Sequence, residues 1–372
     1  MKVDQLKLKK DMTVSELMEQ FDKSGVLGSG RVARASNLLV DMINDEDMDI
    51  FMSLGGPLVP GGMRNIVADL IREKRIKVLI TSGANITHDL LEAFGGRHYR
   101  DLGTNDEDMD IFMSLGGPLV PGGMRNIVAD LIREKRIKVL ITSGANITHD
   151  LLEAFGGRHY RDLGSNDEEL NDAGIGRIAD VYTQGEDFEV FESEIIKIFE
   201  VISKKLDNDG DKGIISIQRL LKEVGLLIDD DNSILRQAAL NDVSIFAPGL
   251  IDSMFGLQLW MFTQDHTLVV DAVGDMHYLS DLVFESEKIG AVMLGGGLPK
   301  HYTLASNLLK GGIDAGLQIT MDRPETGSLS GAPLEEAKSW SKAKHGSNLV
   351  TVIGDVTIIF PLIVADALNR ID

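Results

Sequence analysis

A long internal repeat limits what this chain can fold into. Residues 44–103 are identical, position by position, to residues 105–164, so the period is 61 residues. Two copies that had long packed against different neighbours would have diverged, because each position would face its own constraints. The identity indicates a recent duplication or an artefact of gene assembly. With only two copies, an extended repeat array is not expected.

Each copy has the pattern of a β-α-β-α unit. In the first copy, residues 50–54 form a short apolar strand, followed by a turn rich in Gly and Pro at 55–62. Residues 63–75 have helical spacing, and the segment 76–81 contains the apolar run Val78-Leu79-Ile80, which is typical of a buried parallel strand. A second helix is expected over 88–94, ended by Gly95 and Gly96. The second copy repeats this pattern 61 residues later.

The rest of the chain indicates an α/β protein. From residue 244 onward, short apolar runs alternate with helical patterns, with strands expected at 244–246, 267–270, 290–294, 317–321 and 349–353. This alternation predicts a Rossmann-like parallel sheet with helices on both faces. We expect an N-terminal helical segment at 1–43, a probably extra first copy at 44–104, and an NAD-binding catalytic domain at 105–372. The second copy runs directly into that domain, which favours it as the copy in the cofactor site.

Composition excludes several classes of function. The chain has no Cys, so disulfides, thiol nucleophiles and Cys-ligated metals are ruled out. Its formal charge of −21 disfavours nucleic-acid binding, and it either attracts a cationic substrate or only aids solubility. The charged N-terminus does not fit a signal peptide, and Pro361 and Asp366 interrupt the longest apolar run. We expect a cytoplasmic protein with no membrane partner and no metal.

Glycines after a strand indicate a cofactor site. Gly295-Gly296-Gly297 follow the strand at 290–294 and precede a helix, where backbone N–H groups can approach a phosphate. This is not the G-x-G-x-x-G pattern, so a simple tight turn remains the alternative. Thr142-Ser143-Gly144 and Asp355 also follow strands. Ligands of open α/β sheets gather at such strand ends.

A second group of residues has the chemistry of an amine site. Glu336 and Trp340 are four residues apart in an expected helix over 334–342, so they share a face, and Lys342 follows. A lysine desolvated by an aromatic wall can act as a nucleophile. An acid and an aromatic face suit a polyamine through charge and cation–π attraction. The alternative is a surface helix with a packed Trp.

The segment Ser339-Trp340-Ser341-Lys342 resembles the nucleophile segment of deoxyhypusine synthases, of the archaeal or prokaryotic type. The likeness extends to the segments 295–301, 326–332 and 247–252, to Gly354-Asp355, and to the repeated Ser-Gly-Ala-Asn-Ile-Thr-His-Asp block. The resemblance implies a homotetrameric, NAD-dependent transferase. Such an enzyme moves the aminobutyl group of spermidine, through an imine on Lys342, to a lysine of a hypusine-containing translation factor precursor.

The resemblance also implies roles for individual residues. Lys342 would be the nucleophile, and the donor amine would be held by residues at five positions: His301, Glu336, Trp340, Gly327 and Ser328. NAD would be held by residues at eight positions: Thr142, Ser143, Gly144, His149, Asp252, Gly296, Asp355 and Val356.

Some positions depart from the family pattern. Leu257 and Leu329 stand where acids hold the amine in the eukaryotic form, His88 or His149 replaces an acid near the strand end, and Ser341 replaces the usual Gly. These changes leave alternatives open. They are a transferase with a free amine acceptor (homospermidine synthase-like), one with an agmatine donor, or an inactive NAD-binding homologue.

Overall fold

The structure is a computed structural model that describes residues 2–45, 47–54, 58–81, 83–94, 109–164, 166–210 and 213–370. The chain forms two compact units. We call residues 1–33 with 106–372 the body, and residues 34–105 the spare unit. This division differs from the three segments expected above, because Leu17 and Phe21 of the first helix belong to the body's core. The expected boundary at residue 104 lies outside the described residues.

A six-stranded parallel sheet organises the body, in the order β13-β12-β11-β3-β4-β9. From β3 the chain adds β4 and β9 on one side. It then adds β11, β12 and β13 on the other side of β3. This is the strand order of dinucleotide-binding folds. The predicted fold class is confirmed. The strands are β3 (Asp110–Leu115), β4 (Val139–Thr142), β9 (Ser244–Phe246), β11 (Ile289–Leu294), β12 (Ile313–Thr320) and β13 (Ala343–Ile353).

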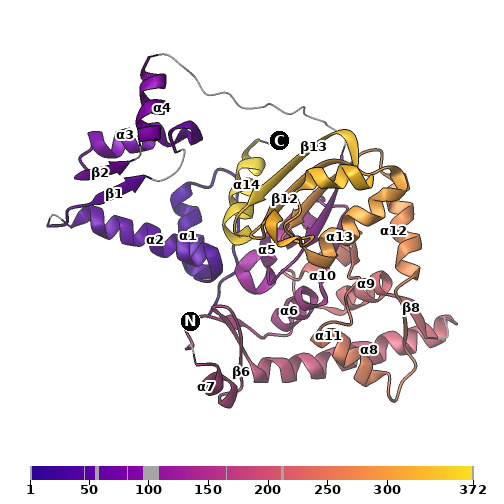
Figure 1. The fold of residues 1–372 in the computed structure, drawn as a ribbon. Coiled ribbons are helices and arrows are strands. Elements are labelled where there is room, and N and C mark those ends of the chain that lie inside the picture. The colour runs from indigo at the N-terminus through magenta and orange to yellow at the C-terminus, as the bar shows by residue number, and fades with distance from the viewer. Residues whose placement is uncertain are drawn as a thin grey trace. The chain divides into compact units, whose positions relative to one another are not determined.

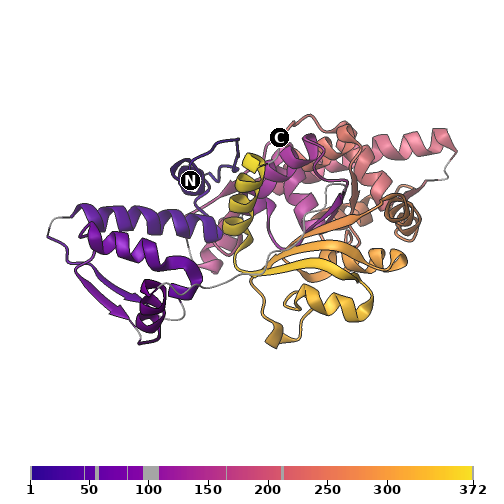
Figure 2. The ribbon, with the colours of Figure 1, turned by 90° about the horizontal axis from the view of Figure 1, so that it is seen from above.

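The sheet is covered on both faces, because successive strand residues point to opposite sides. Phe112 belongs to one buried cluster, while its neighbour Met113 belongs to the other. In Figures 1 and 2, α14 and α13 lie on opposite sides of β12 and β13. One face packs against α1 (Val14–Ser24), α5 (Arg125–Arg133), α6 (Gly144–Ala154), α8 (Gly185–Asp209), α9 (Ile217–Leu227), α10 (Ile234–Asn241), α11 (Met254–Phe262) and α14 (Val356–Arg370). The other packs against α12 (Gly274–Glu285), α13 (Gly297–Ser306) and the 3₁₀-helix η5 (Leu334–Trp340).

Capping side chains decide where several helices begin. Thr13 and Glu16 form a capping box at α1. Helix α6 begins at Gly144, five residues before the expected start of the corresponding helix, because the Ser143 hydroxyl accepts the N–H of Asn146 at 3.3 Å. Within the described ranges, no helix is long and apolar enough to cross a membrane.

Two small sheets were not predicted as such. The expected strand at 267–270 is β10 (Val269–Asp271), which pairs with β8 (Ile214–Ser216) outside the main sheet. An antiparallel sheet joins β5 (His159–Tyr160), β7 (Val181–Gln184) and β6 (Ile175–Ile178), and α7 (Asp167–Asp172) lies between β5 and β6 in the chain. These strands are too short for their hydrophobic periodicity to be recognised.

The spare unit keeps the local fold of the repeat. Strands β1 (Phe51–Leu54) and β2 (Val78–Thr81) pair in parallel, as β3 and β4 do in the body. Helices α3 (Arg64–Arg72) and α4 (Gly83–Ala93) correspond to α5 and α6, and α2 (Leu27–Asn44) leads into this unit. The burial differs: Ile71 is 48% exposed, whereas its counterpart Ile132 is 0% exposed. The same sequence therefore forms its elements in both places, but it is packed into a core only in the body.

Candidate active site

Two glycine loops meet where the direction of the strand order changes. Gly116 follows β3, and Gly295 and Gly296 follow β11. A side chain at Gly116 would place its Cβ 2.5 Å from the Gly296 carbonyl oxygen, and one at Gly295 would lie 2.6 Å from the Gly116 oxygen. Only glycine allows this approach, and Gly295 also has a φ of 80°. Gly296 was predicted as a site residue, whereas Gly116 was missed because the turn after β3 was not linked to phosphate binding.

The ends of β4 and β9 lie beside this crossover. Gly144 lies so close to the loop after β9 that a Cβ would be 2.7 Å from the Leu250 oxygen and 2.6 Å from the Ser253 hydroxyl. That loop carries the exposed carboxylate of Asp252. The hydroxyl of Thr142, at the end of β4, is buried and has no hydrogen-bond partner among the residues that the structure describes. A glycine cradle and an unpartnered buried hydroxyl at one edge fit a bound dinucleotide.

Asp355 and Val356 lie farther along the same edge of the sheet. They follow β13, which is four strands from β4, roughly 19 Å at ordinary strand spacing. One carboxylate oxygen of Asp355 accepts hydrogen bonds from the N–H and hydroxyl of Thr357, at 2.8 and 2.7 Å, at the start of α14. The eight expected cofactor residues therefore do not lie at a single strand end.

His149 points into the protein interior. Its Nδ1 lies 2.9 Å from Nε2 of His159, and its ring packs edge-on against Phe188. Burial, with a smaller effect from His159, lowers the pKa of His149 to about 3, so the ring is neutral at physiological pH. The structure gives this residue an internal hydrogen-bonding position. These contacts give no support to the expected role of His149 in holding NAD.

A pocket brings most of the expected amine-binding residues together. Its volume is about 350 Å³, and its walls come from α13, η5 and the loop between β12 and η5. It is lined by Lys300, His301, Leu304, Leu329, Ala332, Pro333, Glu336, Ala337, Trp340 and Lys342. The Lys342 Nζ atom lies 5.8 Å from the centre of the Trp340 ring, within cation–π range. The site thus combines a carboxylate, an aromatic face, an imidazole and a primary amine.

The segment before Lys342 differs from the expected α-helix. It is a 3₁₀-helix that ends at Trp340, and Ser341 then adopts the left-handed conformation with a φ of 55°. In a 3₁₀-helix, residues three apart share a face, so the argument from a four-residue spacing does not apply. Glu336 and Trp340 both line the pocket nevertheless. The Lys342 N–H then bonds the Ala337 carbonyl at 2.9 Å, which fixes its backbone.

Lys300 was missed by the sequence reasoning. Its side chain is 1% exposed, and its ammonium donates to the carbonyls of Leu329 and Ala332 at 2.8 and 2.6 Å. Burial lowers the pKa of Lys300 to about 8, and the negative charge of Glu336 partly opposes this. The ammonium thereby ties the wall that contains Leu329 to α13. A single lysine after a proline gave no sequence signal for this role.

Gly327 and Ser328 were expected to hold the donor amine, but they do not line the pocket. They lie in an exposed loop, where the Ser328 hydroxyl is 3.1 Å from that of Thr326 and accepts the Gly331 N–H at 3.3 Å. The next residues enter the site instead. Leu329 lines the pocket, and the Ser330 hydroxyl accepts the N–H of Gly297 at 2.7 Å. This loop connects the amine pocket to the glycine turn.

These features define an α/β protein with a dinucleotide-type strand order and a lysine pocket beside its glycine turn. Comparison with known proteins gives the family. The family model for deoxyhypusine synthase matches residues 16–109 and 101–367. The chain belongs to the deoxyhypusine synthase family.

Individual relatives agree with this assignment. A "Probable deoxyhypusine synthase" of Methanothermobacter thermautotrophicus is 54% identical over 369 residues, covering 99% of this chain and 98% of the relative. One from Methanopyrus kandleri is 35% identical over 371 residues, covering 100% and 99%. A solved Entamoeba histolytica structure that also bears the name of a deoxyhypusine synthase is 17% identical, with a TM-score of 0.51. It covers 98% of this chain and 96% of its own, and at that identity it supports the fold alone.

Proposed function

We propose that this protein transfers the aminobutyl group of spermidine to one lysine of a translation factor precursor, with NAD as cofactor. The observation that carries the proposal is the pocket in which Lys342, Trp340, Glu336 and His301 meet. Family membership supports the reaction class. The protein would act as a homotetramer in the cytoplasm.

The pocket residues have distinct tasks in this proposal. Glu336 would attract the cationic donor, and Trp340 would hold an ammonium or methylene segment against its ring. The Lys342 amine would take up the aminobutyl group as an imine, while the remaining diamine leaves. The lysine of the precursor would then replace Lys342 at the same carbon. Covalent transfer divides one difficult substitution into two easier steps.

The carboxyl edge of the sheet would hold the cofactor. The close approach of Gly116, Gly295 and Gly296 would let a pyrophosphate come near the backbone at this edge, where the N–H groups of Gly116 and Gly295 donate to the carbonyls of Leu294 and Ile319. Thr142 offers a buried hydroxyl with no partner among the described residues. Ser143, Gly144, Asp252, Asp355 and Val356 are further candidates along this edge. When bound, NAD would accept the hydride removed from the donor amine and return it to the final imine on the precursor lysine, so the transfer involves no net oxidation.

Borohydride trapping tests the role of Lys342. The protein is incubated with NAD and labelled spermidine, then reduced and digested, and the mass of the Lys342 peptide is measured. We expect an added aminobutyl mass on Lys342. A Lys342→Arg variant keeps the positive charge but lacks the nucleophilic amine, so trapping should disappear and activity should fall by orders of magnitude. A trapped adduct on Lys338 or Lys344 instead would refute the assignment.

A second candidate reaction uses a different amine. Leu329 lines the pocket with 38% of its surface exposed, where an acid would bind the far ammonium of spermidine. An apolar wall there lacks the carboxylate that would pair with that ammonium, and this favours a different amine, such as agmatine as donor or a free diamine as acceptor. Product mass spectrometry separates these reactions, since only the first modifies a protein. If NAD binds and no donor labels Lys342, the protein is an inactive homologue.

A further inference from the structure

The two copies of the repeat have the same internal geometry, although their surroundings differ. An arginine at the start of the first helix bonds an aspartate of the second helix in both, at 2.6 Å for Arg64–Asp89 and 2.7 Å for Arg125–Asp150. The turn glycine has a φ of 84° in one copy and 91° in the other. Each copy therefore forms its local structure independently of its neighbours.

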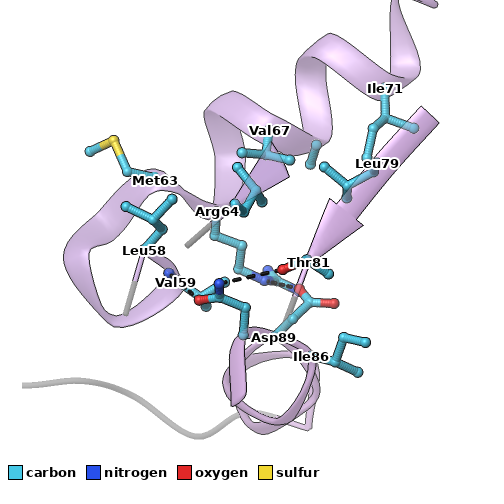
Figure 3. A pocket seen from close by; sticks show the side chains of 13 residues that line it. Leu58, Val59, Met63, Arg64, Val67, Ile71, Leu79, Thr81, Ile86 and Asp89 are labelled. Carbon is cyan, nitrogen blue, oxygen red and sulfur yellow. Dashed lines mark hydrogen bonds and ion pairs between the residues drawn. The ribbon is translucent and has the colours of Figure 1, made fainter. Parts of the chain in front are cut away.

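The spare unit carries an open apolar groove of about 170 Å³ between α3 and α4. Figure 3 shows Val67, Ile71 and Leu79 around this hollow, with Arg64 bonded to Asp89 near one end. The Asp89 side chain is 50% exposed. The groove combines an apolar floor with a carboxylate that water reaches.

In the body, helix α10 fills the corresponding groove. Asp150 accepts hydrogen bonds from the Ser233 hydroxyl at 2.8 Å and from the N–H groups of Ile234 and Leu235 at 3.0 Å each. Arg125 also pairs with Asp230 at 2.8 Å. A carboxylate at a helix N-terminus is electrostatically favourable. Because Asp89 and Arg64 are placed like Asp150 and Arg125, the spare unit has the same acceptor for α10.

The sequence makes the two copies interchangeable. Removing residues 44–104 or residues 105–165 leaves 311 of the 372 residues, and the two products differ only at one junction residue, Ser165 or Thr104. The family model also matches two stretches, 16–109 with the first copy and 101–367 with the second. Either copy can therefore make the same contacts with the other sheet strands and with α10.

We propose that either copy can complete the sheet of the body, and that the copy left over becomes the spare unit. The partner that fits the groove of the spare unit is the body of the same chain. In the alternative arrangement β1 and β2 lie between β11 and β9, α10 docks on α3 and α4, and residues 105–164 are displaced. This inference does not depend on the catalytic proposal.

Matched substitutions in the two copies test this exchange. Val139 in β4 is 0% exposed, and Val78 is its counterpart in β2. An unpaired carboxylate at the centre of the sheet is strongly unfavourable. We expect Val139→Asp to retain cooperative thermal unfolding with a Tm near that of Val78→Asp, because the intact copy takes its place. The double variant should lose the transition. If Val139→Asp is as unfolded as the double variant while Val78→Asp unfolds like the wild type, the proposal is overturned.

Limited trypsin digestion identifies which copy is displaced. Val78→Asp should be cut within the first copy, near Arg72–Lys77, and Val139→Asp within the second, near Arg133–Lys138. The intact masses of the resulting fragments then differ by the 61-residue period. Cleavage of Val139→Asp in the first copy alone would contradict the exchange.

Light scattering separates exchange within a chain from exchange between chains. We expect Val139→Asp to have the molar mass of the wild type across a hundredfold dilution. If Val139→Asp folds only in larger, concentration-dependent species, a second chain supplies the missing copy, and the intrachain proposal is wrong.

Discussion

Ser341 holds a backbone conformation that glycine adopts more easily. It ends η5 with a φ of 55°, immediately before Lys342. A residue with a Cβ is disfavoured in this region by about 1–2 kcal/mol relative to glycine. Part of this difference is offset because glycine loses more conformational entropy on folding. The family's usual Gly at this position therefore has a physical reason. The strain at Ser341 is the local cost of presenting Lys342 to the pocket.

We predict that Ser341→Gly raises the free energy of unfolding by up to about 1 kcal/mol. Urea denaturation with a constant m-value measures this change. Ser341→Ala is the matched control, because it removes the hydroxyl but keeps the Cβ, and it should give no such gain. Equal effects of the two substitutions would mean that the backbone conformation is not the cause.

Asp275 is predicted to make stability depend on pH. It is 2% exposed, and burial raises its pKa from 3.8 to about 6, although the Gln218 N–H donates to it at 2.9 Å. The folded state then binds more protons than the unfolded state between these values. Stability from this group is therefore present below about pH 3.8 and is lost as the pH rises through about 6, with a slope of at most ~1.4 kcal/mol per pH unit.

The test compares Asp275→Asn with the wild type at pH 4 and pH 7. We expect the variant to gain stability relative to the wild type as the pH rises, because its amide stays neutral. Asp281→Asn, at an exposed position of the same helix α12, is the control. A difference between Asp275→Asn and the wild type that is the same at both pH values would refute the prediction.

At the scale of elements, the start of α10 joins two parts of the body. Ser233 is 0% exposed, accepts the Arg236 N–H at 3.2 Å and donates to Asp150 at 2.8 Å. It therefore caps its own helix and also bonds a buried carboxylate of α6. Since Ser233 lies outside the repeat, its contribution is expected whichever copy is in the sheet.

Ser233→Ala should lower the free energy of unfolding by about 2 kcal/mol or more, as the cap and a hydrogen bond to a charged group are both lost. Thr13→Ala removes an exposed cap of α1 and is expected to cost only about 1 kcal/mol. Thermal or urea unfolding of both variants gives the comparison. Equal losses would show that the bond to Asp150 adds nothing.

At the scale of the whole molecule, the spare unit adds apolar surface without adding to the described core. Its Ile66, Ile86 and Phe94 are 56%, 51% and 86% exposed. The two large buried clusters contain body residues only. Exposed apolar patches of this kind promote association.

Deletion of residues 44–104 should therefore reduce concentration-dependent association and change the Tm of the body by no more than a few degrees. Light scattering and thermal unfolding of the 372-residue and shortened chains measure both effects. The proposed homotetramer should persist in the shortened chain. If the full chain is equally soluble and forms the same single species, the spare unit has no effect on assembly.

Much of the fold could be predicted from local patterns. The capping box at Thr13, the apolar strands of the repeat and the strand-Gly-Gly-Gly-helix segment at 290–297 depend on neighbouring residues, so the sequence contains their signal. The pairing of β10 with β8 could not be predicted, because it joins segments distant in the chain through three residue pairs. Lys300 was missed for the same reason, since its carbonyl partners lie 29 and 32 residues away.

The sequence by itself determined the family, the fold class and the nucleophile candidate, because these rest on short motifs and periodicity. It also shows that the chain contains two identical units, but local patterns are the same in both and cannot choose which one enters the sheet. Only the tertiary structure placed β3 and β4 at the centre of the sheet and left β1 and β2 outside it. The tertiary structure also decided that His149 faces His159 and that Leu329, not Ser328, enters the pocket. The reason is that burial depends on contacts between distant residues, which a repeated local sequence cannot specify.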